Sequence, residues 1–185
     1  MKRILLIIMM VCALIDSGSA VARQIKYPVK NNFVTIKNGK FFRNGKPYYY
    51  VGTNLWYGAI LGSTGQGGDR KRLCRELDEL KRMGIDNLRV LVGSDGVRGV
   101  KAKVEPTLQI KPGVYNDTIL AGLDYLLQQM GKRNMVAVLY LNNSWEWSGG
   151  YGFYLENAGE GKAPAPSVDG YPAYMNFVAK YASCT

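Results

Sequence analysis

Residues 135–141 read Met135-Val-Ala-Val-Leu-Tyr-Leu141, an unbroken apolar run that comes directly after a helical pattern. A second mostly apolar run, Ile85-Asp-Asn-Leu-Arg-Val-Leu-Val92, also follows a helical pattern almost at once. Unbroken runs of this length are typical of strands that are buried on both faces, as in parallel sheets. The two runs therefore predict two strands of a parallel sheet, each preceded by a helix.

The helices predicted before these strands have clear ends and one apolar face each. Asp69 is a suitable cap for a helix over residues 70–83, and Gly84 suits its end. Either Asn116 or Asp117 caps the second helix. The positions expected to be buried are Leu73, Leu77 and Leu80 in the first helix, and Ile119, Leu123, Leu126 and Met130 in the second. Residues 171–181 are expected to begin a third helix.

A β-hairpin is predicted before these units. Residues 33–42 form two short β-rich stretches around Asn38-Gly39, a second turn lies at Asn44-Gly45, and the β-rich run 48–53 follows. The remaining order is strand, helix, strand, helix, strand, with short links before strands and long loops after them. In α/β barrels the loops after the strands build the active site.

A doubly wound nucleotide-binding sheet is the alternative fold. Such a sheet needs a phosphate-binding glycine fingerprint directly between strand and helix. The segment Gly62-Ser-Thr-Gly-Gln-Gly-Gly68 is rich in glycine but lacks the GxGxxG and GxxxxGK[ST] spacings. The barrel is therefore the favoured fold, and no nucleotide cofactor is expected.

The composition of the 185 residues excludes several classes of site. The chain has no His, which excludes Ser-His-Asp and Cys-His catalytic sites and His-ligated zinc within it. Cysteines are too few for a disulfide framework, and no metal-ligand cluster or cofactor is expected. The net charge of +10 raises nucleic acid as a partner, and residues 23–46 hold seven basic residues and no acid. These residues are spread singly without a known nucleic-acid signature, so nucleic acid is not expected.

Residues 1–22 have the pattern of an export signal. Lys2 and Arg3 precede an apolar run over residues 4–15, and Ala20-Val21-Ala22 resembles a cleavage site. That run is too short to span the ~30 Å of a membrane core, so stable membrane insertion is not expected. Residues 23–32 are interpreted as a linker, and the mature protein is expected to be secreted or periplasmic.

Four stretches together resemble a known enzyme family. They are Phe41-Phe-Arg-Asn-Gly-Lys-Pro47, Tyr50-Val-Gly-Thr-Asn-Leu-Trp-Tyr57, Asp86-Asn-Leu-Arg-Val-Leu91 and Leu139-Tyr-Leu-Asn-Asn-Ser-Trp-Glu-Trp-Ser-Gly-Gly150. In this order they resemble the start of glycoside hydrolase family 5, most closely its endo-β-1,4-mannanases. The resemblance implies that residues 33–185 are the N-terminal part of a (β/α)8 TIM barrel, with about three βα units after the hairpin.

The resemblance also implies a sugar-binding site at the strand ends. Arg89 is a charged residue within the apolar run 85–92, where an arginine is rare unless it is paired; the alternative is that it reaches solvent at a strand end. In this family an Arg at this position holds the nucleophilic carboxylate ionised and oriented. The aromatic residues after the strands are candidate platforms for pyranose rings, with loop packing as the alternative, and the amides are candidate partners of sugar hydroxyls. The candidates for substrate binding are Asn54, Trp56, Tyr57, Asn142, Asn143, Trp145 and Trp147. Asn54 and Asn143 fit equally well as turn residues.

The catalytic glutamates of the family are expected to be missing from these residues. A retaining glycosidase needs two carboxyl groups about 5–5.5 Å apart, and the family places them at the ends of the fourth and seventh strands, the first after an Asn. The chain contains no Asn-Glu pair, and Glu146 is the only acid in a plausible position, where sugar contact or solvation is favoured over catalysis. We therefore expect an inactive fragment with exposed sheet edges and poor solubility.

Two functional questions stay open at this level. The backbone of the β-linked polysaccharide is open between mannan, glucomannan and cellulose, so an endo-β-1,4-glucanase of the same family is one alternative. A non-catalytic carbohydrate-binding module is another, because it would use the same aromatic residues. Such modules are usually β-sandwiches, and the two predicted amphipathic helices argue against that fold.

Overall fold

The computed structural model describes residues 33–97 and 103–180. The predicted export signal at 1–22, the predicted linker at 23–32 and Cys184 lie outside these residues. The chain divides into two compact units, one ending at Tyr48 and the other beginning at Tyr49.

The first unit contains the predicted hairpin, extended by a third strand. Its antiparallel sheet has the order β1-β2-β3, formed by β1 (Thr35–Lys37), β2 (Lys40–Arg43) and β3 (Lys46–Pro47). Each connection is a two-residue Asn-Gly turn with positive φ at both positions, 50° and 72° at Asn38-Gly39 and 52° and 74° at Asn44-Gly45. Asn and Gly tolerate this left-handed conformation, which suits tight hairpins. The prediction of both turns is confirmed.

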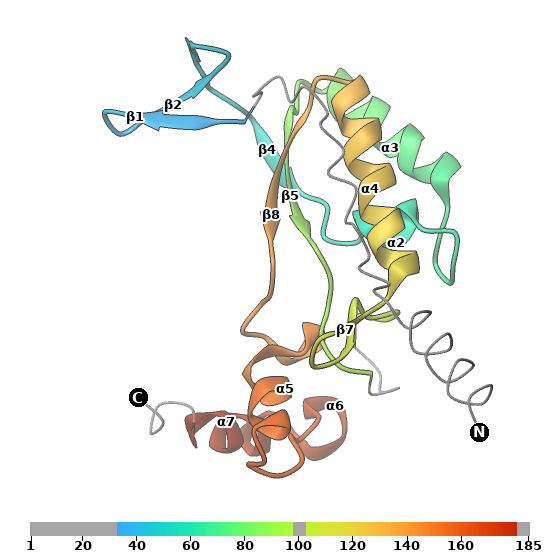
Figure 1. Cartoon of the computed structure of the whole chain (residues 1–185), viewed down its shortest axis with the longest axis vertical. Coiled ribbons are helices and arrows are strands. Elements are labelled where there is room, and N and C mark those ends of the chain that lie inside the picture. The colour runs from blue at the N-terminus through green and yellow to red at the C-terminus, as the bar shows by residue number, and fades with distance from the viewer. Residues whose placement is uncertain (1–32, 98–102, 181–185) are drawn as a thin grey trace, which may run out of the picture. The chain divides into compact units, whose positions relative to one another are not determined.

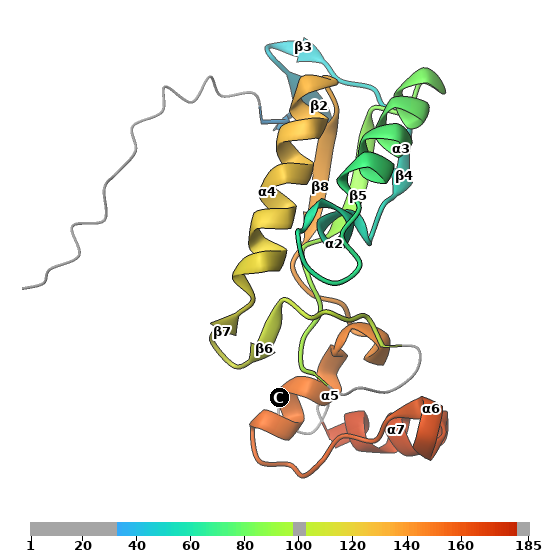
Figure 2. The same ribbon diagram turned by 90° about the vertical axis from the view of Figure 1, so that its right-hand side faces the viewer.

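The second unit is built on a parallel sheet of three strands. The strands are β4 (Gly52–Asn54), β5 (Asn87–Leu91) and β8 (Val136–Tyr140), adjacent in the order of the chain. The connecting helices are α3 (Arg70–Arg82) and α4 (Asp117–Lys132). Both helices lie on the same side of the sheet (Figures 1 and 2). A doubly wound sheet has helices on both faces, so this winding is that of a βα barrel. The described strands do not close into one.

The two long helices begin where capping predicts. The Asp69 carboxylate accepts a hydrogen bond from the Arg72 amide at 2.8 Å, ahead of α3. At α4 the Asn116 side chain accepts from the Thr118 amide at 3.0 Å, so Asn116 and not Asp117 is the cap. Each cap satisfies an amide that has no partner within the first turn of its helix.

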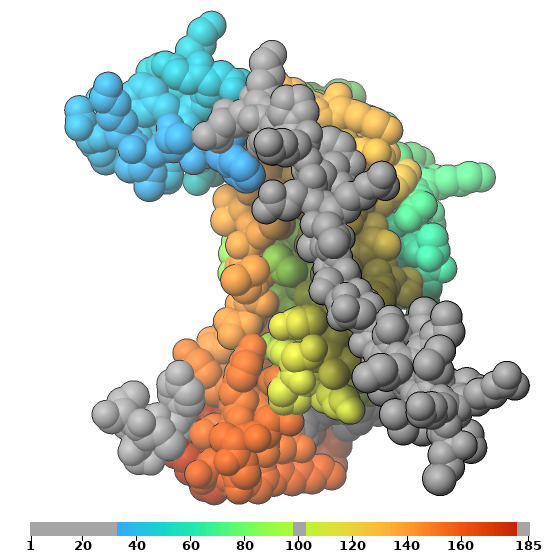
Figure 3. Space-filling view, viewed as in Figure 1, coloured from blue at the N-terminus to red at the C-terminus, as the bar shows by residue number. Residues whose placement is uncertain are grey.

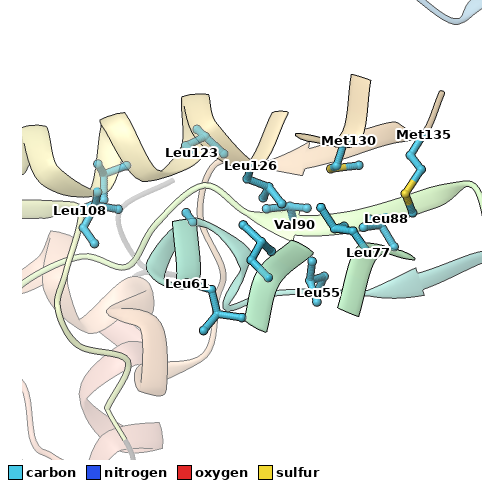
Figure 4. Close-up of a cluster of buried hydrophobic side chains, with 13 residues drawn as sticks. Leu55, Leu61, Leu77, Leu88, Val90, Leu108, Leu123, Leu126, Met130 and Met135 are labelled. Carbon is cyan, nitrogen blue, oxygen red and sulfur yellow. The ribbon is translucent and has the colours of Figure 1, made fainter. Parts of the chain in front are cut away.

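The hydrophobic core lies between the helices and one face of the sheet (Figure 4). Leu88 and Val90 of β5 are fully buried in it, because alternate residues of a strand point to the same face. The core contains six of the seven helix positions predicted to be buried, with Leu80 packed at its margin. Its members are Leu55, Ala59, Leu61, Leu73, Leu77, Leu88, Val90, Leu108, Ile119, Leu123, Leu126, Met130 and Met135.

The prediction that residues 135–141 are buried on both faces is wrong. Val138 and Leu139 of β8 are 46% and 40% exposed, and Leu141 beyond the strand is 78% exposed. Figure 3 shows β8 open to view along much of its length. The physical reason is that β8 is an edge strand of this sheet, and no second layer covers the face opposite the helices among the described residues.

The long loops contain short elements that were not predicted. They are α2 (Gly58–Gly62), β6 (Gln109–Lys111), β7 (Val114–Tyr115), the 3-10 helix η1 (Glu146–Ser148), α5 (Gly150–Asn157) and α6 (Pro166–Asp169). The predicted third helix is present as α7 (Tyr171–Val178). Within residues 33–97 and 103–180, no helix has the length and apolar character needed to cross a membrane.

Candidate functional site

Arg89 lies on the open face of the parallel sheet. Its neighbours along β5, Leu88 and Val90, point into the core, so its own side chain points the other way, where it is exposed. Asn54 is its register partner on β4, and Arg89 Nη1 donates to Asn54 Oδ1 at 3.4 Å. The predicted pair of site residues is therefore brought together on one face.

Tyr140 of β8 completes this group. The Arg89 guanidinium carbon lies 3.7 Å from the centre of the Tyr140 ring, which is the geometry of a cation–π contact. Burial raises the pKa of the Tyr140 hydroxyl, and the Arg89 charge partly offsets this. In the described part of the chain no carboxylate forms an ion pair with Arg89. An amide oxygen and an aromatic ring contact the Arg89 guanidinium, and its positive charge remains available to bind an anion.

Three of the predicted aromatic residues share one cleft. Trp56 and Tyr57 follow β4, and Trp147 lies in η1 after β8. The Trp56 ring centre is 6.1 Å from that of Trp147 and 5.3 Å from that of Tyr57, with edge-to-face geometry. The cleft they line has a volume of about 770 Å³. Loops that follow two different strands thus supply its aromatic walls.

The cleft also has polar walls that the sequence did not reveal. Arg72 of α3 and Lys103 and Glu105 of the loop after β5 line it. The Tyr57 hydroxyl donates to Glu76 Oε2 at 3.0 Å, and Arg72 Nε donates to Glu76 Oε1 at 2.6 Å. Burial, followed by the contact with Glu76, raises the pKa of Tyr57. The Tyr57 hydroxyl is thus engaged with Glu76 while its ring lines the cleft.

Trp145 lies in a different hollow from Trp147. Its ring is 6.3 Å from that of Tyr171, and both line an apolar groove of about 420 Å³ beside α7. Residues two apart around a 3-10 turn point in different directions, because that helix has three residues per turn. The four aromatic candidates therefore divide between two sites.

The two predicted asparagines after β8 also differ in their contacts. Asn143 Oδ1 accepts from the Trp145 amide at 3.0 Å, so Asn143 is a turn residue here. Asn142 Nδ2 donates to the Tyr154 hydroxyl at 3.4 Å, and that hydroxyl donates to Asp95 Oδ2 at 3.1 Å. Asn142 is exposed, and its carbonyl oxygen and second N–H lie outside this chain of contacts.

Asp95 is the buried carboxylate at the centre of this network, and the sequence did not single it out. It is 6% exposed, and its Oδ1 accepts from Gln109 Nε2 at 2.9 Å. The Lys103 ammonium donates to the main-chain oxygens of both Asp95 and Glu146, at 2.9 and 3.3 Å. The loops after β5 and β8 are therefore joined by partly buried polar contacts.

Glu146 is half-buried in the turn between the two tryptophans. Its Oε2 atom is shielded from solvent and has no hydrogen-bond partner among the described residues. Across residues 33–97 and 103–180 no three Cys, Asp or Glu side chains gather as metal ligands would. The described residues therefore offer an aromatic cleft and, on the open face of the sheet, a cation contacted by an amide; Arg89, Asn54 and Asn142 do not line the cleft.

Comparison with known proteins identifies this barrel-type chain. The model of the glycoside hydrolase family 5 beta-mannosidase-like family matches residues 31–185. The mannan endo-1,4-beta-mannosidase 7 of Arabidopsis thaliana is 30% identical over 139 residues, which cover 75% of this chain and 30% of the relative. The mannan endo-1,4-beta-mannosidase 5 of Solanum lycopersicum is 27% identical over 148 residues, which cover 80% of this chain and 33% of the relative.

Solved structures agree with this match. A family 5 mannosidase from Rhizomucor miehei superposes with a TM-score of 0.73 at 38% identity, covering 81% of this chain and 37% of that one. A variant of the mannosidase from the same organism, in complex with mannosyl-fructose, superposes with a TM-score of 0.73 at 39% identity. The match covers 81% of this chain and 37% of that one. The endo-1,4-beta-mannanase from that organism shares the fold, with a TM-score of 0.53 at 24% identity, over 82% and 40%.

The fold is that of part of a (β/α)8 barrel, and the solved structures and curated relatives that it matches are named as mannosidases and mannanases. The chain belongs to glycoside hydrolase family 5, in its beta-mannosidase-like branch. It spans about a third of the length of the curated relatives that it matches.

Proposed function

We propose that this chain forms the first three βα units of an endo-β-1,4-mannanase and binds β-1,4-linked mannan or glucomannan. The observation that carries the proposal is the Trp56–Trp147 pair, which unites loops after the first and third parallel strands in one cleft. Flat aromatic rings stack on the apolar faces of pyranose rings. The names of the relatives support mannan over cellulose as the substrate.

We propose that Arg89, Asn54 and Asn142, which do not line the aromatic cleft, supply polar contacts to the same sugar chain. In a complete barrel the open face of this sheet points to the barrel interior. We propose that Arg89 there meets the nucleophilic carboxylate and keeps it ionised, since a cation lowers the pKa of a carboxyl group beside it. The retaining reaction needs two such carboxyl groups, which the family resemblance places beyond the third strand. The chain by itself is therefore proposed to bind but not to hydrolyse.

Binding is tested by calorimetric titration of the chain with mannohexaose and, separately, cellohexaose. Trp56→Ala is expected to weaken mannohexaose binding about tenfold, because a lost stacking contact is worth about 1 kcal/mol or more. Tyr115→Ala, which removes an exposed aromatic from β7 outside the cleft, serves as the matched control and should change binding less than twofold. Trp145→Ala measures whether the sugar also reaches the second groove.

Two results would contradict the proposal. Equal loss in the Trp56 and Tyr115 variants would show that the cleft is not the binding site, and tighter binding of cellohexaose would favour the glucanase alternative.

Hydrolysis is tested by reducing-sugar release from galactomannan, where release by the chain alone would disprove the proposed inactivity. Release after adding the remaining barrel segment from a relative would support the role as a barrel portion.

We also propose that the protein is exported, on the basis of the pattern in residues 1–22. Intact-mass measurement of the protein recovered from the periplasm or medium tests this. Loss of about 22 residues is expected, and an intact N-terminus on cytoplasmic protein would contradict export.

A further inference from the structure

The hairpin unit has a charge pattern that the proposed mannan site does not use. Residues 33–48 contain four basic residues and no acidic residue. Lys37, Lys40 and Lys46 are exposed to solvent, and none of the three has an ion pair in the described structure. No carboxylate lies within residues 33–48, so this segment by itself carries four positive charges.

Apolar side chains accompany these charges. Ile36 and Phe41 are register partners and therefore share one face, where they are 71% and 45% exposed. Arg43 lies two residues beyond Phe41 and so on the same face, paired in register with Lys46. The face thus combines an exposed apolar pair with a basic pair. The Lys37–Lys40 pair stands at the Asn38-Gly39 turn, on the opposite face of the hairpin.

We propose that the hairpin unit binds an acidic polysaccharide, namely a chain of uronic acid residues. A uronate ring offers a carboxylate at its rim and apolar C–H groups on its face. These match Lys46 and the Ile36–Phe41 pair on one face of the hairpin, while Lys37 and Lys40 offer their charges to neighbouring uronates from the other face. Lysine suits such scattered single charges, because its ammonium is a flexible point charge. This interaction is independent of the mannan site, which lies in the other unit.

The observations favour a polysaccharide over a nucleic acid. The three unpaired cations are all lysines, whereas reading of base edges relies chiefly on bidentate side chains such as arginine. The apolar pair consists of one aliphatic and one aromatic residue, not a row of aromatic platforms for successive bases. The family to which the chain belongs acts among polysaccharides, by the names of its members.

The test uses the full chain and fluorescently labelled polygalacturonate, with binding followed by anisotropy. The triple variant Lys37→Gln, Lys40→Gln, Lys46→Gln is expected to bind about tenfold more weakly, as three exposed charge contacts would require. The matched control Lys71→Gln, Lys111→Gln, Lys162→Gln removes the same charge from exposed positions of the second unit. It should change the affinity less than twofold.

A charge-conserving triple, with Arg at positions 37, 40 and 46, separates charge from folding. This Arg triple is expected to bind polygalacturonate with the affinity of the native chain. Rising salt should weaken the binding, because it shortens the electrostatic screening length from ~10 Å at 0.1 M to ~3 Å at 1 M. Equal loss in the hairpin and control triples, no binding by the native chain, or no rescue by Arg would overturn the proposal. Tighter binding of a labelled DNA duplex than of polygalacturonate would assign the surface to nucleic acid instead. Unchanged mannohexaose binding in the Lys37, Lys40, Lys46 triple variant would show that a loss of polygalacturonate binding does not come from the mannan site.

Discussion

The contact between α2 and α4 allows a sharp test of the fold, because two glycines of α4 differ only in their surroundings. A Cβ atom added at Gly122 would lie 2.2 Å from the main-chain oxygen of Ala59 and 2.7 Å from the amide nitrogen of Ser63. A Cβ atom added at Gly131 would meet nothing within 4 Å. Gly122→Ala and Gly131→Ala therefore make the same chemical change in the same helix with opposite packing consequences.

The expected magnitudes follow from these contacts. Backbone atoms cannot yield as a flexible side chain does, so overpacking at Gly122 is expected to cost about 3 kcal/mol, the upper part of the usual range. Replacing a helical Gly by Ala returns about 1 kcal/mol of helix propensity. The net loss in the free energy of unfolding is therefore about 2 kcal/mol for Gly122→Ala. Gly131→Ala, in the last turn of α4, should gain about 0.5 kcal/mol.

Urea-induced unfolding at low micromolar concentration, followed by far-ultraviolet circular dichroism, measures both variants. Because Ile60 and Leu61 of α2 line the Trp56 cleft, displacement of α2 should also weaken mannohexaose binding in Gly122→Ala but not in Gly131→Ala. If the two variants were equally stable, the close approach of α2 to α4 would be refuted. If Gly122→Ala lost stability but kept full affinity, α2 would not shape the cleft.

Two further predictions concern the polar contacts. Tyr154→Phe removes the hydroxyl between Asn142 and Asp95. It should weaken mannohexaose binding several-fold and lower the free energy of unfolding by about 1–3 kcal/mol, because the buried Asp95 carboxylate loses a donor. Unchanged affinity would show that this hydroxyl does not position Asn142. Asp78 joins α3 to α4 by accepting from Arg133 Nε at 2.7 Å, and this hydrogen bond lowers the pKa of its carboxyl below the usual 3.8. A depressed pKa stabilises the folded state above the unfolded pKa and ceases to do so as the pH falls. The native chain should therefore exceed Asp78→Asn in stability at pH 7 and lose that advantage progressively as the pH falls below 3.8, as urea titrations across pH would show. A constant difference would contradict the assignment.

The sequence predicted the elements whose signals are local and strong. The Asn-Gly turns, the cap at Asp69 and the apolar stripes of α3 and α4 each depend on residues close together in the chain. Short elements such as α2 were missed because five residues with two terminal glycines have no helical periodicity to detect. Its position is set by contacts with α4, about sixty residues further along the chain, which no local pattern encodes.

The site residues divide in the same way. Sequence position alone placed Trp145 and Trp147 in one loop, but the direction of each ring depends on the turn that separates them, so the structure assigns them to different hollows. Asp95 was not found because its role arises from Gln109 and Tyr154, which reach it from distant parts of the chain. Among single residues, a charged side chain within an apolar strand was the strongest local signal, and it pointed to Arg89.

The position of Arg89 explains why one strand can serve both the core and the site. Leu88 and Val90 anchor β5 through one face, so the backbone that carries Arg89 is fixed by core packing and not by the site itself. The guanidinium is then oriented by Asn54 on one neighbouring strand and the Tyr140 ring on the other. Neither partner carries a negative charge, so the Arg89 charge is oriented without being neutralised. An arginine held in this way stabilises a carboxylate brought to the open face more strongly than one already paired with an acid, because no existing ion pair must be broken first.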